Sequence, residues 1–282
     1  MKNELALSGE KIEHKIYTEY FLNIGMIRGE YLIREINKNI TLDETQKFLY
    51  NYLKNICRIY FDEFVWYRLS ELTNTESNNL DGTKEKLLDK HPLFGIRGAR
   101  RLLNYENEFL AEMSVINKVY ESNKNLSIFI PFVNDSIQLN KIIKKIRNTN
   151  FEGNIGCMIE LPSAFFDLDN ILDLGIDRIV IGMNDLTSFI YATVRNSEWH
   201  NMESDIMLNI IKEVYFKAKN KNIELSVAGY LKKSLVDKLN SIGIKCIIHY
   251  SLIPEILGKD IEFPNHLKEV KARSERYYKI KN

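Results

Sequence analysis

Short runs of apolar, largely β-branched residues alternate along the chain with longer stretches whose apolar positions have helical spacing. The short runs predict eight β-strands, at residues 24–29, 65–70, 94–98, 127–133, 155–160, 178–183, 225–229 and 246–250. The longer stretches predict helices at residues 42–63, 106–122, 136–147, 163–174, 204–221 and 232–242. Strand and helix therefore follow one another along most of the chain.

This alternation is typical of a parallel sheet that closes into a barrel with its helices outside. The competing arrangement is an open doubly wound sheet, but no GxGxxG or GxxxxGK[ST] motif follows a predicted strand. We therefore predict an α/β protein with a single (β/α)8 TIM barrel at residues 1–262 and a short basic C-terminal extension at residues 263–282. Residues 73–90 are polar and predict a long loop after the second strand, which is a candidate lid.

The composition excludes several other classes of protein. The chain has 282 residues, of which 45% are apolar and 27% charged, and this balance is enough for one large buried core. The net charge of +1 provides no field that would gather nucleic acid, and no apolar run approaches the roughly 20 residues of a membrane span. The start of the sequence lacks a secretory signal pattern, and the three cysteines lack metal-type spacing. We expect a cytoplasmic protein with no nucleic-acid or membrane partner.

Polar residues gather where the predicted strands end. Barrel enzymes carry their chemistry at this rim, because the loops after the strands converge on one mouth. Seven polar residues fall there: Arg28, Arg68 and Arg97 at the first three strands, Glu160 at the fifth, and Asn184, Asp185 and Arg195 after the sixth. The predicted rim therefore combines four arginines with two carboxylates and an amide.

This set of side chains indicates a small, densely anionic ligand. Guanidinium groups bind phosphate and carboxylate in a bidentate way, and two carboxylates on adjacent strands are a minimal seat for Mg²⁺. A compound with both a phosphate and a carboxylate fits best. Any one of these arginines or carboxylates, taken alone, is more often a salt-bridge partner than a ligand-binding residue, so the anion site depends on their convergence.

Several segments match known motifs, and they do so in the same order. They are IGMIRGEYLI, YRLSELTNTESNNLDG, HPLFGIRGARRLL, IFIPFV, GCMIELPSAFFDLD and IVIGMNDLTSF. Together they resemble the C-terminal PEP-binding TIM-barrel domain of the PEP-utilising enzymes: phosphoenolpyruvate synthase, pyruvate phosphate dikinase and the first enzyme of the sugar phosphotransferase system. The resemblance extends over roughly residues 15 to 258.

The resemblance implies a role for each of the rim residues. Arg28 and Arg97 match the arginines that hold the phosphoryl group in this family, and Arg68 and Arg195 match two further arginines around the same ligand. Glu160 and Asp185 match the ligands of Mg²⁺, which Mn²⁺ can replace, and Asn184 matches the amide that contacts the substrate carboxylate. The family also implies a homodimer.

The chain departs from the family at the catalytic cysteine. The seventh strand of the family ends in a Cys-Gly pair whose thiol handles the proton at the methylene carbon, whereas this chain has Ala228 followed by Gly229. Three nearby residues are candidate replacements: Tyr230, His249 and Cys246. Histidine has the best-matched pKa for this work near neutrality. Each also has a structural explanation: His249 as a hydrogen-bonded wall residue, Cys246 as a small buried hydrophobe and Tyr230 as a loop anchor.

Three hypotheses for the function follow. The first is an Mg²⁺-dependent phosphotransferase half that binds phosphoenolpyruvate or a related 2-oxo or enolpyruvyl acid, with the phosphohistidine and ATP-grasp parts on a separate protein. The second is a lyase or mutase that uses a pyruvate enolate. The third is a non-catalytic module that senses PEP, since an intact pocket does not establish turnover. We take the first as the working hypothesis, with Arg28, Arg97, Tyr230 and His249 as its catalytic candidates.

Overall fold

The protein is a closed barrel of eight parallel strands in the order β1 to β8, as a computed structural model shows. The structure describes residues 1–84, 88–91 and 94–258. Each strand pairs in parallel with the next, and β8 pairs with β1. This confirms the predicted (β/α)8 barrel. The predicted extension at residues 263–282 and its boundary lie outside the described residues.

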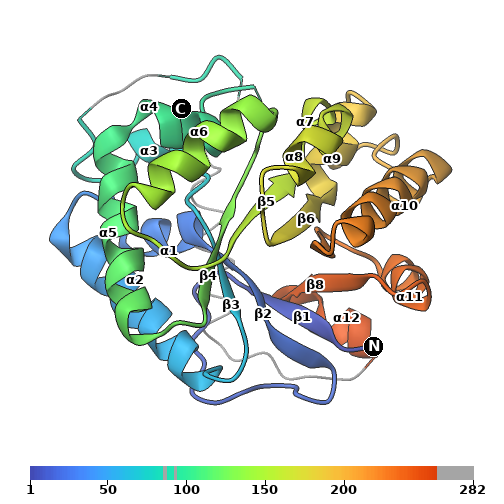
Figure 1. The fold of residues 1–282 in the computed structure, drawn as a ribbon, viewed down its shortest axis with the longest axis horizontal. Helices are drawn as coiled ribbons and strands as arrows, with labels where there is room; N and C mark the ends of the chain where they lie inside the picture. The colour runs from blue at the N-terminus through green and yellow to red at the C-terminus, as the bar shows by residue number, and fades with distance from the viewer. Residues whose placement is uncertain (85–87, 92–93, 259–282) are drawn as a thin grey trace.

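The helices surround the strands, as Figure 1 shows. The strands are β1 Asn3–Leu7, β2 Phe21–Arg28, β3 Val65–Arg68, β4 Leu126–Ile130, β5 Ile155–Ile159, β6 Arg178–Gly182, β7 Glu224–Ala228 and β8 Lys245–His249. The helices are α1 Gly29–Ile36, α2 Asp43–Ile59, α3 Asn74–Asn78, α4 Ala99–Asn104, α5 Glu106–Ser122, α6 Ser136–Arg147, α7 Pro162–Phe166, α8 Leu168–Leu172, α9 Met183–Ile190, α10 Asp205–Asn220, α11 Lys233–Ser241 and α12 Ile253–Leu257. None of the helices in the described ranges is both long and apolar enough to cross a membrane.

The predicted number of strands is correct, although one predicted strand is not a strand and one observed strand was not predicted. Residues 94–98 are not a strand, because they form turns that lead into α4. Gly98 has a φ of 50°, and a Cβ there would lie 2.6 Å from the Cβ of Phe132. The loop therefore docks on the end of β4, where the Ala99 N–H donates to Pro131 O at 2.9 Å. The strand that the prediction missed is β1, Asn3–Leu7.

The predicted loop at residues 73–90 is also partly wrong, since it contains α3. Thr73 caps this helix in a reciprocal capping box with Glu76. Asp89 then accepts hydrogen bonds from the N–H of Asn74 at 2.8 Å and of Ile96 at 3.1 Å. The described part of the segment is thus tied to the barrel, and residues 85–87 of the predicted lid lie outside the described residues.

The interior of the barrel is a packed layer, with one residue from each strand. The layer consists of Ala6, Met26, Trp66, Phe129, Met158, Val180, Ala228 and Ile247. Trp66 and Phe129 stack with their ring centroids 4.4 Å apart. Because side chains alternate along a strand, the residues two positions further on face the mouth. Arg28, Arg68, Glu160 and His249 occupy such positions, so the alternation places them above the apolar layer.

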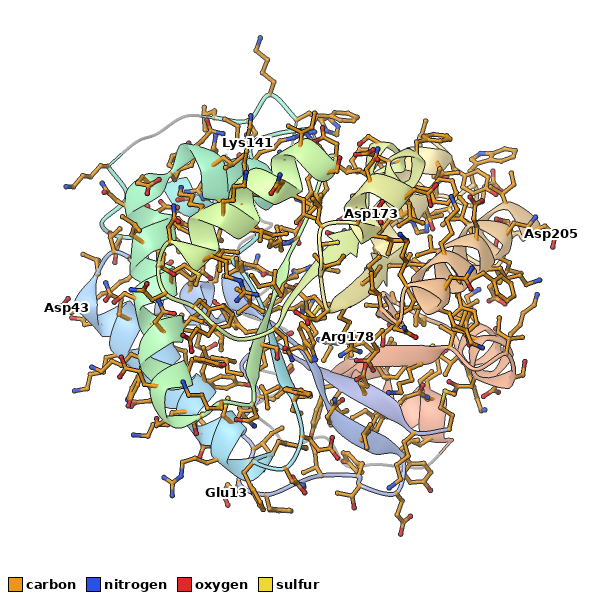
Figure 2. All side chains as sticks on the ribbon, in the orientation of Figure 1. Glu13, Asp43, Lys141, Asp173, Arg178 and Asp205 are labelled. Atoms are coloured by element: carbon orange, nitrogen blue, oxygen red, sulfur yellow. The ribbon has the colours of Figure 1, made fainter. Side chains whose placement is uncertain are left out.

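Below this layer, a buried ion pair closes the other end of the barrel. Arg178 at the start of β6 pairs with Glu4 of β1, and both side chains are 0% exposed. Ser226 of β7 donates to Glu4 Oε2 at 2.9 Å. Figure 2 labels Arg178 among the strands. This polar cluster explains why β1 carries a glutamate in a strand that is buried along its whole length.

Candidate active site

Three buried carboxylates meet at the barrel mouth. Glu71 lies three residues after the end of β3, Glu160 directly follows β5, and Asp185 lies in the first turn of α9. Each offers one oxygen, and these oxygens all lie within 4.8 Å of one another. The sequence predicted Glu160 and Asp185 but missed Glu71. The position of Glu71 three residues after Arg68 could have indicated it, but the prediction did not consider this spacing.

Arginines alternate with these carboxylates. Arg68 Nη1 lies 2.8 Å from Glu71 Oε2 and 3.9 Å from Glu160 Oε1. Arg97 Nη2 pairs with the other oxygen of Glu71 and lies 3.1 Å from Asp185 Oδ2. Arg195 Nη2 lies 2.6 Å from Asp185 Oδ1. The fold therefore brings three of the predicted arginines together with both predicted metal ligands.

Local features of the backbone hold this group in place. The Phe132 N–H donates to Glu160 Oε2 at 2.8 Å, from a residue whose φ is 55°. The guanidinium of Arg97 lies 4.4 Å from the centre of the Phe132 ring. Gly182 at the end of β6 leaves room for Glu160, because a Cβ there would lie 2.5 Å from Glu160 Cγ. Arg97 thus reaches the mouth from a docked loop rather than from the strand that the sequence predicted.

The pKa values of two of these carboxyls shift in opposite directions. Burial raises the pKa of Glu160 to about 8, and the neighbouring Glu71 adds to this shift. Burial acts in the same direction on Asp185, but Arg97 and Arg195 outweigh it and hold the pKa of Asp185 below its usual value. Three buried carboxylate oxygens within 4.8 Å of one another are a donor set that suits a hard divalent cation such as Mg²⁺ or Mn²⁺. The residues present therefore fit the metal that the sequence predicted.

Arg28 belongs to a second polar group at the same mouth. Its Nε donates to Ser8 Oγ at 2.9 Å, and Ser8 Oγ lies 3.3 Å from His249 Nε2. Arg28 is the register partner of Arg68 on the neighbouring strand. Within the described ranges no ion pair joins Arg28 to the three carboxylates. Ser8 was missed because it follows β1, which the sequence analysis did not recognise.

His249 is half-buried in this second group. Burial, and then the charge of Arg28, lower the pKa of His249 well below its usual value, so the imidazole is neutral near pH 7. Its Nδ1 lies 2.6 Å from Ser251 Oγ. A neutral imidazole with one nitrogen toward Ser8 can accept a proton, which suits a base better than an acid.

The other candidate replacements for the missing thiol are placed differently. Cys246 is fully buried, and burial raises the pKa of its thiol to about 12, so it is not a reactive thiolate. The Tyr230 side chain is 63% exposed. Ala228, at the position of the family cysteine, belongs to the interior layer next to the mouth.

The amide of Asn184 is oriented by the turn after β7. The Tyr230 N–H donates to Asn184 Oδ1 at 3.0 Å. Gly229 has a φ of 152°, a value that favours glycine, and a Cβ there would lie 3.1 Å from the Cβ of Met183. The retained glycine therefore supports the approach of this turn to Asn184.

Comparison with known protein families matches residues 10–251 to the PEP-binding domain of PEP-utilising enzymes. A probable phosphoenolpyruvate synthase of Archaeoglobus fulgidus is 27% identical, with 90% of this chain and 34% of that protein covered. The phosphoenolpyruvate synthase of Pyrococcus furiosus is 26% identical, with 73% of this chain and 27% of that protein covered. The chain thus spans about a third or less of the length of these relatives.

Among solved structures, the HpcH/HpaI aldolase from Desulfitobacterium hafniense DCB-2 has the same fold. Its TM-score is 0.50 at 13% sequence identity, and the match covers 100% of this chain and 94% of that chain. At this identity the likeness concerns the fold alone. The family match, by contrast, extends over most of the chain and includes every rim residue described above. The chain belongs to the PEP-utilising enzymes, and residues 10–251 are its PEP-binding domain.

Proposed function

We propose that this chain binds phosphoenolpyruvate, or a related 2-oxo or enolpyruvyl acid, together with Mg²⁺ or Mn²⁺. It would form the substrate half of a phosphotransferase whose phosphohistidine domain belongs to another chain. The observation that supports this most directly is the alternation of arginines and buried carboxylates at one mouth. The mouth offers separate partners for an anion and for a cation within one small volume.

Each residue has a proposed part in binding. Arg28 and Arg97 would hold the phosphoryl group, and Arg68 and Arg195 would neutralise the remaining charge. Glu160 and Asp185 would hold the metal ion, and Asn184 would contact the substrate carboxylate. A bound Mg²⁺ would supply electrostatic stabilisation of the oxygen that becomes an enolate when phosphorus leaves.

The charge balance of the site supports joint binding of anion and cation. Arg28, Arg68, Arg97 and Arg195 carry four positive charges, and Glu30, Glu71, Glu160 and Asp185 offer four carboxylates. An anion that binds Arg68, Arg97 and Arg195 through the nitrogens now paired takes these arginines away from carboxylates. The released carboxylates then favour a cation, so each ligand improves the site for the other.

The proton step requires a residue other than the family thiol. We assign this step to His249, acting with Ser8. The other two candidates suit it less, because Cys246 is fully buried and Tyr230 is largely exposed. A neutral His249 would remove a methyl proton from bound pyruvate. The measurement is exchange of the pyruvate methyl protons with deuterium in the presence of Mg²⁺. His249→Gln should slow this exchange at least tenfold while pyruvate still binds, and an unchanged rate would remove His249 from the mechanism.

A lyase or mutase is the second proposal, and Ala228 is the observation that favours it. Without a thiol at this position, an enolate formed in the mouth would persist longer and could attack carbon or phosphorus. Release of pyruvate from a C–C bonded acid would support this reading. A module that binds PEP tightly without turnover, with or without a partner protein, is the third.

Calorimetric titration with PEP, with and without Mg²⁺, tests the main proposal. Arg97→Ala should abolish binding, because Arg97 contacts two of the three carboxylates and lies at the centre of the site. Arg100→Ala is the matched control, since Arg100 approaches the same Phe132 ring at 5.7 Å but its guanidinium donates to Asn134 instead. Binding that depends on Mg²⁺ and on Arg97, but not on Arg100, supports the proposal. Absence of binding in both conditions rejects it.

We also propose a homodimer, as the family resemblance implies. Analytical ultracentrifugation of the purified chain at micromolar concentration tests this directly. A monomer at all concentrations would contradict it.

A further inference from the structure

Glu71 is the carboxylate that the sequence did not predict, and its two oxygens have different partners. Oε2 lies 2.8 Å from Arg68 Nη1, and Oε1 pairs with Arg97 Nη2. The Glu71 side chain is 3% exposed, and both guanidinium groups are largely buried. An internal carboxylate therefore bridges two of the arginines that the proposed function assigns to the substrate.

The same carboxylate also belongs to the group of three that fits a cation. One oxygen of Glu71 lies within 4.8 Å of oxygens of Glu160 and Asp185. Arg68 and Arg97 can each donate a further hydrogen bond, because the buried Nε of each has no hydrogen-bond partner. The structure thus places Glu71 between a pair of anion-binding groups and a pair of cation-binding groups.

We propose that Glu71 exchanges its partners when the ligands bind. A phosphate or carboxylate group of the substrate takes the place of Glu71 on Arg68 and Arg97, and the released Glu71 joins Glu160 and Asp185 around the divalent cation. This inference rests on the proposed function. It makes Glu71 an internal competitor of the anion and a third ligand of the cation, so that the two ligands bind cooperatively.

The neighbouring carboxylates are less suited to such an exchange. Glu160 accepts from the Phe132 N–H and lies 3.9 Å from its nearest arginine nitrogen. Glu30 pairs with Arg68 but is not one of the three carboxylates. Asp185 also bridges two arginines, but one of them is Arg195, whose side chain is 48% exposed and therefore better screened by water. Glu71 is the carboxylate that holds two buried arginines.

The backbone that follows Glu71 is fixed, which confines the exchange to a side-chain rotation. Arg101 of α4 donates to Asn74 Oδ1 and Ser77 Oγ of α3, each at 2.8 Å. Arg34 of α1 lies 2.7 Å from Glu76 of the same helix. Because α3 is held from two sides, a change of partner at Glu71 does not require the segment to move.

Glu71→Gln is the test, because it keeps the size of the side chain and removes its charge. Two probes are titrated separately: inorganic phosphate without metal, by calorimetry, and Mn²⁺ alone, by electron paramagnetic resonance. We expect phosphate to bind about tenfold more tightly and Mn²⁺ about tenfold more weakly than in the unmodified protein. Glu30→Gln is the matched control, since it removes the other carboxylate on Arg68 and should leave Mn²⁺ affinity within about twofold.

The opposite signs of the two effects distinguish exchange from a structural role. Weaker binding of both probes by a folded Glu71→Gln protein, or no change in either, would overturn the exchange. PEP binding by the unmodified protein would then still support the proposed function, and its absence would reject that function separately. If Glu71→Gln does not fold, Glu71→Asp provides the second variant. Its carboxylate is one methylene too short to bridge both arginines, so phosphate should bind more tightly, and weaker binding would count against the proposal.

Discussion

The two ends of this barrel both hold arginines and carboxylates, but they use them in different ways. At the start of the strands, Arg178 and Glu4 form a fully buried pair, with Ser226 as a shared neighbour. At the mouth, Glu71 and Asp185 are each shared between two arginines, and Arg195 is half exposed. The apolar layer that contains Trp66 separates the two groups.

The difference shows that arginine–carboxylate pairs can stabilise the fold at one end of the barrel and be available for ligand binding at the other. Arg178 Nε also lies 3.7 Å from Glu224 Oε2, but Glu4 is fully buried and has Arg178 as its countercharge, so this pair must stay together whenever the protein is folded. A mouth in which partners are shared can give up one contact without leaving any charge unpaired. A site of the second kind can admit ligands, because each incoming charge replaces a charge of the same sign.

The largest effect is expected from breaking the sealed pair. Arg178→Met leaves Glu4 buried without a countercharge, which should destabilise the protein by about 3–5 kcal/mol. Arg97→Ala should cost clearly less, because Glu71 keeps Arg68 and Asp185 keeps Arg195. Urea denaturation of the two variants measures the comparison. Equal losses would contradict the distinction between the two ends, and adding Glu4→Gln to Arg178→Met should recover part of the stability.

A buried carboxyl between neutral donors provides the next prediction. Glu112 of α5 accepts from Tyr67 OH at 2.6 Å and from the Ser70 N–H at 2.9 Å, and burial raises its pKa to about 7. A raised pKa means that the folded state holds the proton more tightly. The contribution to stability is therefore complete below about pH 4.5 and is lost as the pH rises through 7, by about 3 kcal/mol at most.

Glu112→Gln should remove this pH dependence while keeping the acceptor oxygen. Urea denaturation at pH 5 and pH 8 gives the measurement. The variant should lose less stability between these values than the unmodified protein does. An identical pH profile would show that Glu112 is ionised at both values.

Two glycines at different heights of the barrel test whether metal binding belongs to the mouth alone. Gly182→Ala places a methyl 2.5 Å from Glu160 Cγ, and Gly156→Ala places one 2.5 Å from the ring of Phe129 in the apolar layer. Each should destabilise the protein by about 1–3 kcal/mol through overpacking. Mn²⁺ affinity, measured on folded protein, should fall at least tenfold for Gly182→Ala and should not change for Gly156→Ala. Loss of affinity in both variants would show that the site depends on the whole barrel.

The smallest effect on stability is expected from introducing the cysteine that the family has at the position of Ala228. Ala228→Cys adds one sulfur at the top of the interior layer, where it should change stability by less than about 1 kcal/mol. If the mouth stabilises an enolate, the thiol should speed deuterium exchange of the pyruvate methyl group about tenfold. No gain, with pyruvate bound, would mean that Ala228 does not face the methyl carbon.

Much of the fold could be predicted because its signals are local. The β-branched runs of β3, β5, β6 and β8 are buried strands that alternate with amphipathic helices, and α5 and α6 begin and end where the pattern placed them. The strand β1 was missed because Asn3 and Glu4 look unlike a buried strand. Glu4 finds its partners far away in the sequence: Arg178, 174 residues on, and Ser226, 222 residues on.

The residues of the candidate site also divide into those that the sequence identified and those that it did not. Motifs identified Arg28, Arg68, Arg97 and the other rim residues, but they did not identify Glu71 or Ser8. The role of each depends on a partner that is distant in the sequence: Arg97 for Glu71 and His249 for Ser8. Similarly, the apolar run at residues 94–98 resembles a strand, but docking of Gly98 against Phe132 makes it a loop.

The sequence alone determined the class of fold, the family and the chemical types at the rim, because these depend on periodicity and on short motifs. The tertiary structure decided which carboxylate each arginine holds, which histidine lies beside Arg28 and Ser8, and that Glu71 lies between the anion and cation groups. The physical reason is that ion pairing and burial depend on distances in space. Those distances are fixed only when the eight strands close into a barrel and β8 pairs with β1.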